Sequence, residues 1–356
     1  MPTRTTAVAG SDYPGPICAE ATRVKFMAPS GVHEKLTIID GLIFWSDGTS
    51  EGLRRGNVAA ANVTVCGFQA DFLTACDELS GWRNIASSAS SGWHVVRSID
   101  DIEIARSRGK VGLIMGFQNL RPIEDKLDRL AFFHDAGIRI MQLTYNERNF
   151  IGDGCLENSD AGLSVEEMNR LGIAIDLSHV GERSCFDALA HSRAPVLITH
   201  ANAKAVLDLP RNKGDRVLKK VAARGGTVGA SLHCFMCWDG NSRRRHTISD
   251  FAMHINYLRD LVGINSIAMG TDFPAVSSVD RIPSLNATGI RYPFFDRYHA
   301  AFGSSITAKY PVDCNSPADL RRLTDALLAN GWSEDDLTAF YGRNVIRVLR
   351  RIWHSE

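Results

Sequence analysis

Three short apolar runs of this chain each end in residues that bind metals or transfer protons. The first is followed by Asp176-Leu-Ser-His179, the second ends in Ile198-Thr-His200, and the third leads to Gly270-Thr-Asp272. Neutral imidazoles and carboxylates are ligands of Zn²⁺, and histidines that end neighbouring strands can reach one ion. His179 and His200 are therefore candidate metal ligands. Asp272 is a candidate third ligand or a proton acceptor.

Each of these residues also has an ordinary structural interpretation. A histidine after a strand can be a hydrogen-bonded core residue, and Asp272 can cap the turn that follows it. Because the two histidines occupy matching positions after consecutive runs, we favour a shared polar site. His233 follows another run, where a structural role is the more common one, but His233 and Gln118 are also candidates to complete a metal site.

Polar residues at the ends of several strands need a fold in which those ends converge. Short β-rich runs alternate here with helical patterns, which indicates an α/β protein with repeated βαβ units and a parallel sheet. The 356 residues, 44% of them hydrophobic, suffice for one (β/α)8 TIM barrel, whose active site lies at the carboxyl ends of its strands. The eight strands are expected at 36–40, 61–65, 111–117, 138–143, 173–177, 196–199, 227–232 and 266–270.

Helices with recognisable ends separate these runs. One at 125–136 ends at Gly137, one opens with a Ser164–Glu167 capping box and ends near 171, and one at 249–261 closes at Gly263. Residues 1–35 are expected to wrap around the barrel as an extension. Residues 36–356 are expected to form a single barrel domain that closes with three helices, after an irregular stretch at 274–311.

Composition excludes several classes of partner. The net charge is zero, and the only dense basic run, Arg243-Arg244-Arg245-His246, is interpreted as a solvated loop, so we expect no nucleic acid partner. The sequence has no secretory signal and no uninterrupted apolar stretch of about 18 residues, which predicts a cytoplasmic protein with no membrane partner. Eight cysteines in such a chain predict buried thiols rather than a disulfide framework.

Together these blocks resemble the renal-type (membrane) dipeptidases, peptidase family M19, and we interpret the chain as a divergent bacterial member. The resemblance rests on Asp40-Gly41, on 169–179, on 192–200, on Arg211-Asn212, on Gly270-Thr-Asp-Phe273 and on a closing helix that begins at Asn344. It implies a barrel of the metal-dependent hydrolase type with two zinc ions bridged by a glutamate. It also implies that His179 and His200 bind one ion, that Asp272 binds the other and accepts a proton, and that Arg211 binds the substrate carboxylate. A homodimer is a further implication of the family, which nothing else in the sequence indicates.

The chain departs from this family at three places. The His-x-Asp pair after the first strand is replaced by Leu42-Ile-Phe44, the bridging glutamate by Gln118, and a histidine that contacts substrate by Tyr145. Two divalent ions roughly 3.5–4 Å apart need a bridging anion and carboxylates to offset their repulsion. We therefore expect a degenerate site with at most one divalent ion, zinc being the first candidate, and no binuclear zinc centre.

Three functions remain open at this stage. The first is a hydrolase of dipeptides or small amides with weak dipeptidase activity. The second is a non-peptidase enzyme that acts on a small zwitterion such as an N-methylated amino acid or a betaine, because the faces of Phe44, Trp45 and Tyr145 could hold an organic ammonium beside Gln118. The third is a catalytically silent binding protein in which these aromatic residues simply fill the vacated metal pocket. All three would take a small molecule that carries a carboxylate.

Overall fold

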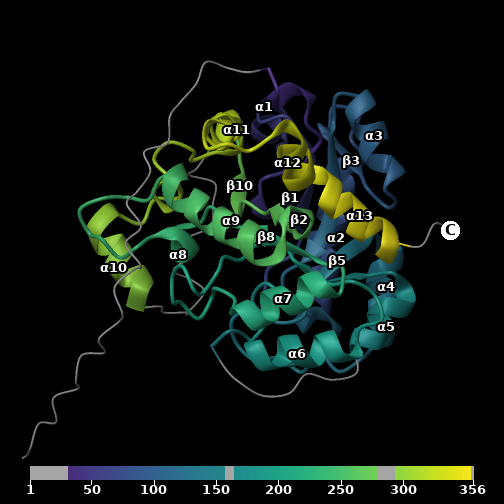
Figure 1. The fold of residues 1–356 in the computed structure, drawn as a ribbon. Coiled ribbons are helices and arrows are strands. Elements are labelled where there is room, and N and C mark those ends of the chain that lie inside the picture. Colours follow the sequence, from purple (N-terminus) through teal and green to yellow (C-terminus); the bar gives the residue numbers. More distant parts are fainter. Residues whose placement is uncertain (1–30, 157–163, 279–292, 354–356) are drawn as a thin grey trace, which may run out of the picture.

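The computed structural model describes residues 31–156, 164–278 and 293–353 (Figure 1). At its centre, parallel strands curl into a barrel in the order β10-β1-β2-β4-β5-β6-β7-β8-β9, and the short β3 adds to the edge of β4. The strands are β1 (Ile38–Ser46), β2 (Val58–Thr64), β3 (Trp93–Val95), β4 (Val111–Phe117), β5 (Ile138–Gln142), β6 (Ala174–Asp176), β7 (Leu197–Ile198), β8 (Thr227–Ala230), β9 (Ile267–Met269) and β10 (Phe273–Ala275). The predicted α/β class and TIM-barrel architecture are confirmed.

The barrel closes where the segment after β9 runs along β1. The carboxylate of Asp40 accepts hydrogen bonds from the backbone N–H of Thr271 at 2.8 Å and from its hydroxyl at 2.6 Å. The N–H of Asp272 then donates to the carbonyl of Leu42 at 3.1 Å. Glycine is required beside this seam, because a Cβ on Gly270 would lie 1.8 Å from the carbonyl oxygen of Thr199.

The last helix, α13 (Asn344–Ile352), closes the amino end of the barrel. Its buried residues recur at helical spacing (Val345, Val348, Leu349 and Ile352) and pack against inward-facing side chains near the start of the strands, such as Ile39, Ile114 and Ile140. The carboxyl ends of the strands are therefore the end left for a site.

The remaining helices surround the strands (Figure 1). They are α1 (Glu51–Arg55), α2 (Phe72–Ser87), α3 (Asp100–Ser107), α4 (Asp128–Ala136), α5 (Ser164–Leu171), α6 (Glu182–His191), α7 (Asp215–Ala223), α8 (Cys234–Cys237), α9 (Ile248–Val262), α10 (Pro293–Phe302), α11 (Leu320–Ala329) and α12 (Glu334–Thr338). In the part of the chain that the structure describes, no helix combines the length and apolarity needed to cross a bilayer.

Most of the predicted elements are present, with shifted ends. All eight predicted strand runs are strands, and α4 ends at Gly137, whose φ of 113° is the left-handed conformation that glycine adopts readily. The helix predicted at 249–261 is α9, which begins one residue earlier, after a capping box between Thr247 and Asp250. The predicted strand 36–40 begins later and continues to Ser46. The sequence analysis missed β3 and β10, which are only three residues long.

Two predictions concern segments at the margins of the described residues. The expected extension at 1–35 falls almost entirely outside them, since the structure describes only residues 31–35 of it, with a short 3-10 turn at His33–Lys35. The stretch 274–311, predicted to be irregular, contains the end of β10, α10 and a 3-10 turn at Ile306–Lys309. This prediction was therefore wrong for those parts, and residues 279–292 lie outside the described chain.

No disulfide joins the cysteines that the structure describes.

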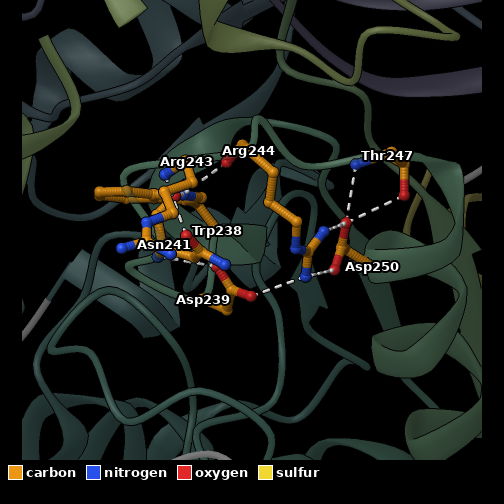
Figure 2. Close-up of polar contacts among 7 residues, drawn as sticks. All are labelled: Trp238, Asp239, Asn241, Arg243, Arg244, Thr247 and Asp250. Atoms are coloured by element: carbon orange, nitrogen blue, oxygen red, sulfur yellow. Dashed lines mark hydrogen bonds and ion pairs between the residues drawn. The ribbon is translucent and has the colours of Figure 1, made fainter. Parts of the chain in front are cut away.

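The basic run at 243–246 is a loop with exposed arginines at 243 and 244, as predicted, but its side chains also make contacts that the sequence analysis did not expect. Arg244 donates to Asp250 at 2.8 Å and to Asp239 at 2.6 Å, and the same Asp250 carboxylate caps α9 through Thr247 (Figure 2). Arg245 donates to the backbone carbonyls of Thr307 and Tyr310, and His246 is buried. The run therefore fastens the loop between α8 and α9, because its charges have partners that the linear sequence did not reveal.

Candidate functional site

The side chains of His179 and His200 meet at the carboxyl ends of β6 and β7. Their Nε2 atoms lie 3.0 Å apart, and both residues are buried. Two nitrogens bound to one tetrahedral zinc ion, each about 2.0–2.1 Å from it, lie roughly 3.3 Å apart. The structure thus brings the two predicted metal ligands to a separation close to that of ligands on a shared ion.

The hydrogen bonds behind the two imidazoles fix which nitrogen of each carries a proton. His179 Nδ1 lies 2.6 Å from the side-chain oxygen of Asn146, which can only accept. His200 Nδ1 lies 2.8 Å from the hydroxyl oxygen of Thr199. That hydroxyl donates its own proton to Asp176 at 2.6 Å, so it accepts from the histidine. Both Nδ1 atoms are therefore donors, and both Nε2 atoms direct lone pairs into the site.

The carboxylate of Asp176 ties the two histidine-bearing segments together. It accepts from the N–H and hydroxyl of Ser178, at 3.0 and 2.6 Å, and from the N–H of Thr199 at 2.9 Å. Burial raises the pKa of Asp176, and the same hydrogen bonds oppose that rise. Asp176 is thus an indirect support of the histidine pair, which it positions through Ser178 and Thr199.

The electrostatic environment keeps the imidazoles neutral. Burial lowers the pKa of both His179 and His200 well below the ordinary value, and the nearby guanidinium of Arg211 lowers it further. A neutral imidazole is the form that binds a metal ion. The pair is therefore in the protonation state that binds a metal ion, but the charge of Arg211 that opposes its protonation also opposes a metal cation.

Arg211 lies beneath this pair, where it is buried. Its Nη2 donates to the backbone carbonyl of His200 at 2.7 Å, and its Nη1 donates to the carbonyl of Ser178. Two of the guanidinium donors are therefore used to hold the loops after β6 and β7. The role in carboxylate binding that the sequence suggested for Arg211 stays a prediction.

Asp272 follows β9, which is separated from β7 in the sheet only by β8. Its φ of 61° is in the left-handed region that non-glycine residues seldom adopt, and its carbonyl accepts a hydrogen bond from the hydroxyl of Tyr310. Burial raises the pKa of the Asp272 carboxyl to about 7, and Arg211 acts against that shift. A carboxyl with such a pKa can accept and release a proton near neutral pH.

The sequence analysis expected no metal ligands at Leu42, Phe44 and Gln118, and the structure shows what these side chains contact instead. Leu42 is buried and Phe44 packs against the hydrophobic core, and neither side chain has a lone pair to offer. Gln118 is neutral, and its amide donates to the hydroxyl of Thr64 at 2.8 Å. Within the described ranges, no group of three or more His, Cys, Asp or Glu side chains is arranged to hold a metal ion. The residues therefore fit one ion on two imidazoles and do not fit a binuclear centre.

Tyr145 covers His179 in a stack of three rings. Its ring centroid lies 4.1 Å from that of His179 and 4.2 Å from that of Phe68, with interplanar angles of 21° and 12°. Among the described residues, Phe44 and Trp45 are not ring partners of Tyr145. Trp45 instead pairs in register with Pro274 of β10. The aromatic neighbour that the sequence analysis missed is Phe68, which lies in the loop after β2.

His233 serves as the N-cap of α8, where its Nδ1 accepts from the N–H of Phe235 at 3.3 Å. Its ring also packs edge-on against Tyr310, with centroids 5.4 Å apart.

Asn146 is the other residue that the sequence analysis missed, although its φ of 58° and its place after β5 mark it as unusual. An asparagine in Leu-Thr-Tyr-Asn carries no sign in sequence that its oxygen meets a histidine 33 positions later.

A barrel with two convergent imidazoles and a carboxyl at the carboxyl ends of its strands has the architecture of the metal-dependent hydrolases. Residues 50–287 match the family described as Membrane dipeptidase (Peptidase family M19). The chain belongs to this family.

Comparisons with individual proteins agree with this assignment. The chain is 28% identical over 279 residues to Dipeptidase tcpJ of Claviceps purpurea and 30% identical over 261 residues to Dipeptidase aclJ of Aspergillus oryzae. These alignments cover 76% and 70% of this chain, but the chain spans only 58% and 53% of those two proteins. An amidohydrolase structure from Pseudomonas aeruginosa is similar at 31% identity with a TM-score of 0.77, covering 92% of this chain and 99% of that one.

Proposed function

We propose that this protein hydrolyses the amide bond of a small, carboxylate-bearing, dipeptide-like substrate with the help of one divalent metal ion bound by His179 and His200. The observation that carries the proposal is the 3.0 Å separation of two Nε2 atoms whose lone pairs both face the site. Relatives named dipeptidases and a similar structure named an amidohydrolase support the reaction class. The family's metallopeptidase members support metal dependence.

Each group has a defined part in this proposal. An ion held by the two imidazoles would polarise a carbonyl oxygen or lower the pKa of water. Asp272, with a pKa of about 7, would accept the proton of the attacking water and pass it to the leaving nitrogen. Asn146 and Thr199 keep both Nε2 atoms deprotonated, and Tyr145 shields one face of His179 from solvent. Because a catalytic zinc ion usually has three protein ligands, we expect weaker binding and slower turnover than a complete site would give.

Metal titration and an amide-hydrolysis assay on matched variants test this proposal. His179→Asn and His200→Asn each retain a donor at the δ position while removing Nε2. Loss of a residue that hydrogen-bonds to a metal ligand costs about 10–100-fold in metal affinity. Loss of a ligand itself should weaken metal binding by at least that factor. It should also abolish hydrolysis of a dipeptide panel. The exposed His191 is the control, and His191→Gln should change neither quantity. Zinc affinity unchanged in both asparagine variants would refute the proposed site.

A silent binding protein is the competing function, and the missing third ligand favours it. The same assay separates the two possibilities. Stoichiometric ligand binding with no turnover of any dipeptide, in the presence of added Zn²⁺, Mn²⁺ or Co²⁺, would assign the protein to that second class.

A further inference from the structure

We propose that a cleft beside the histidine pair binds the leaving part of the substrate, and that this part is an aromatic amino acid with a free carboxylate. Arg121 would bind the carboxylate, and Phe68 and Phe150 would pack on the aromatic side chain. This inference rests on the proposed hydrolase function, because the cleft is useful only if the amide bond lies next to His179.

The cleft lies at the carboxyl end of the barrel and has the size of a small-molecule site. Its volume is about 420 Å³, within the range of roughly 300–1,000 Å³ that is usual for such sites. Phe68 and Gln69 after β2, Asn119 and Arg121 after β4, and five residues between 145 and 150 after β5 line it. It therefore draws on three consecutive loops at the end of the barrel where substrate must enter.

Hydrogen bonds between these loops preform the cleft. The side chain of Asn149 donates to the side-chain oxygen of Asn119 at 2.7 Å. Asn119 in turn donates to the backbone carbonyl of Phe68 at 2.8 Å. Because the three loops are joined by side chains that line the cleft itself, its shape does not depend on a bound ligand.

Tyr145 connects the cleft to the candidate catalytic centre. It lines the cleft, and its ring is stacked between Phe68 and His179. The thickness of one aromatic ring thus separates the cleft from the imidazole. The proposal therefore requires a ligand whose body lies in the cleft to extend past the edge of Tyr145, so that its amide bond lies beside the histidine pair.

The charges around the cleft indicate which residue binds the carboxylate of the ligand. Arg148 lines the cleft, but its Nε donates to the buried Asp153 carboxylate at 2.8 Å, so its charge is balanced within the protein. Arg121 is exposed and, among the described residues, has no carboxylate within ion-pair distance, although it lies close enough to the exposed Asp71 to interact with its charge. Arg211 already donates to two backbone carbonyls. Arg121 is thus the guanidinium placed to bind a carboxylate, and the exposed Glu147 disfavours a carboxylate at the far wall.

The aromatic preference follows from an unusual exposed side chain. Phe150 is 78% exposed although it lines a cleft, and Phe68 presents a second ring there. An apolar group that packs against either ring would remove apolar surface from water, which favours binding. A phenylalanine-like side chain should therefore bind better than an alanine-like one.

Calorimetric titration of the full chain tests the proposal with N-acetyl-L-phenylalanine, its methyl ester and N-acetyl-L-alanine. We expect the acid to bind at least 10-fold more tightly than the ester, and Arg121→Gln to abolish that difference. Phe150→Ala should abolish the preference for the phenylalanine compound over the alanine compound. The control is Arg55→Gln, since Arg55 is also exposed but lies just before β2, at the amino end of the barrel. It should leave all three affinities unchanged.

Three results would overturn the proposal: no binding of the acid at millimolar concentration, equal binding of acid and ester, or an acid preference that survives in Arg121→Gln. The last would place the carboxylate at another residue. Calorimetry registers binding without turnover, so this test is separate from that of the hydrolase function. Acid-selective binding without hydrolysis would support the proposed cleft and refute the proposed hydrolase function. Hydrolysis without acid selectivity would support the hydrolase function and refute the cleft.

Discussion

At the scale of single residues, the site depends on the acceptors behind the two imidazoles. Asn146 accepts from His179, and Thr199 accepts from His200 while it donates to Asp176. These bonds orient both rings and leave both Nε2 lone pairs available. The same partners would set how strongly the pair holds an ion, because an acceptor behind a ligating histidine raises the basicity of its ring.

A pair of substitutions at Asn146 tests this role. Glycine suits the positive φ of this position but removes the acceptor, so Asn146→Gly should weaken zinc binding by about 10–100-fold. Asn146→Asp keeps an acceptor and adds a negative charge, so it should bind zinc at least as tightly as the natural protein. Competition with a chromophoric chelator measures both affinities. Equal affinities for the two variants would show that Asn146 does not support the site.

Arg211 gives the second test at this scale. Its guanidinium donates to two backbone carbonyls in a buried region, and hydrogen bonds to charged groups contribute about 1.5–3 kcal/mol each. We expect Arg211→Gln to lower the free energy of unfolding by roughly 2–4 kcal/mol in urea denaturation. Arg193→Gln, at an exposed arginine, is the control and should change it little. Unchanged stability with a weakened affinity for carboxylates would instead make Arg211 a ligand-binding residue.

Sequence reasoning could nominate residues whose type and strand-end position carry a signal. His179, His200 and Asp272 were found in this way, and the structure brings the two histidines into contact. Asn146 and Phe68 were missed because amides and single aromatic residues in loops are common everywhere. What distinguishes them is a partner in another loop, and only the folded chain shows that partner.

At the scale of elements, each strand presents its last residues to the same end of the barrel. Asp40 of β1 is held by Thr271, yet the next outward positions of β1 are apolar. The strand therefore has a structural carboxylate at Asp40 but no side chain at 42 or 44 that could bind a metal ion. Long buried runs such as β4 were predictable from sequence. The similarly short β6, β7 and β9 lie within longer apolar runs and were predicted, whereas β3 contains His94 and β10 contains Pro274, so neither forms such a run.

Restoration of the missing ligands tests this account of β1 and β4. The triple change Leu42→His, Phe44→Asp and Gln118→Glu supplies two carboxylates and an imidazole at the vacated positions. We expect the metal content to rise toward two ions per chain, measured by elemental analysis after dialysis against zinc. Circular dichroism checks that the variant folds. A folded variant without any gain would mean that these positions do not face the histidine pair.

At the scale of the whole molecule, buried neutral histidines make stability depend on pH. His254 of α9 is buried, and burial lowers its pKa from the ordinary value of 6.5 to about 3. Below pH 6.5 the unfolded chain therefore binds a proton at this residue, whereas the folded chain does not. The contribution of His254 to the free energy of unfolding is therefore fully present above pH 6.5, and it is lost as the pH falls below 6.5.

The slope of stability against pH measures this contribution. Between pH 7 and 5.5, His254 should account for a loss of about 1 kcal/mol in the free energy of unfolding. His254→Gln should reduce the total loss over that interval by this amount, whatever its stability at pH 7. The exposed His191→Gln should retain the slope of the natural protein. Parallel slopes for all three proteins would show that His254 is protonated in the folded state.

Metal content per chain tests the central claim most directly. The protein should be purified without added metal or chelator, then saturated with zinc, desalted and analysed by inductively coupled plasma mass spectrometry. One ion on His179 and His200 is the expected maximum, because β1 and β4 supply no ligands for a second. The account predicts a stoichiometry of one or less, which falls to zero in the His179→Asn, His200→Asn double variant. Two tightly bound zinc ions per chain would contradict it.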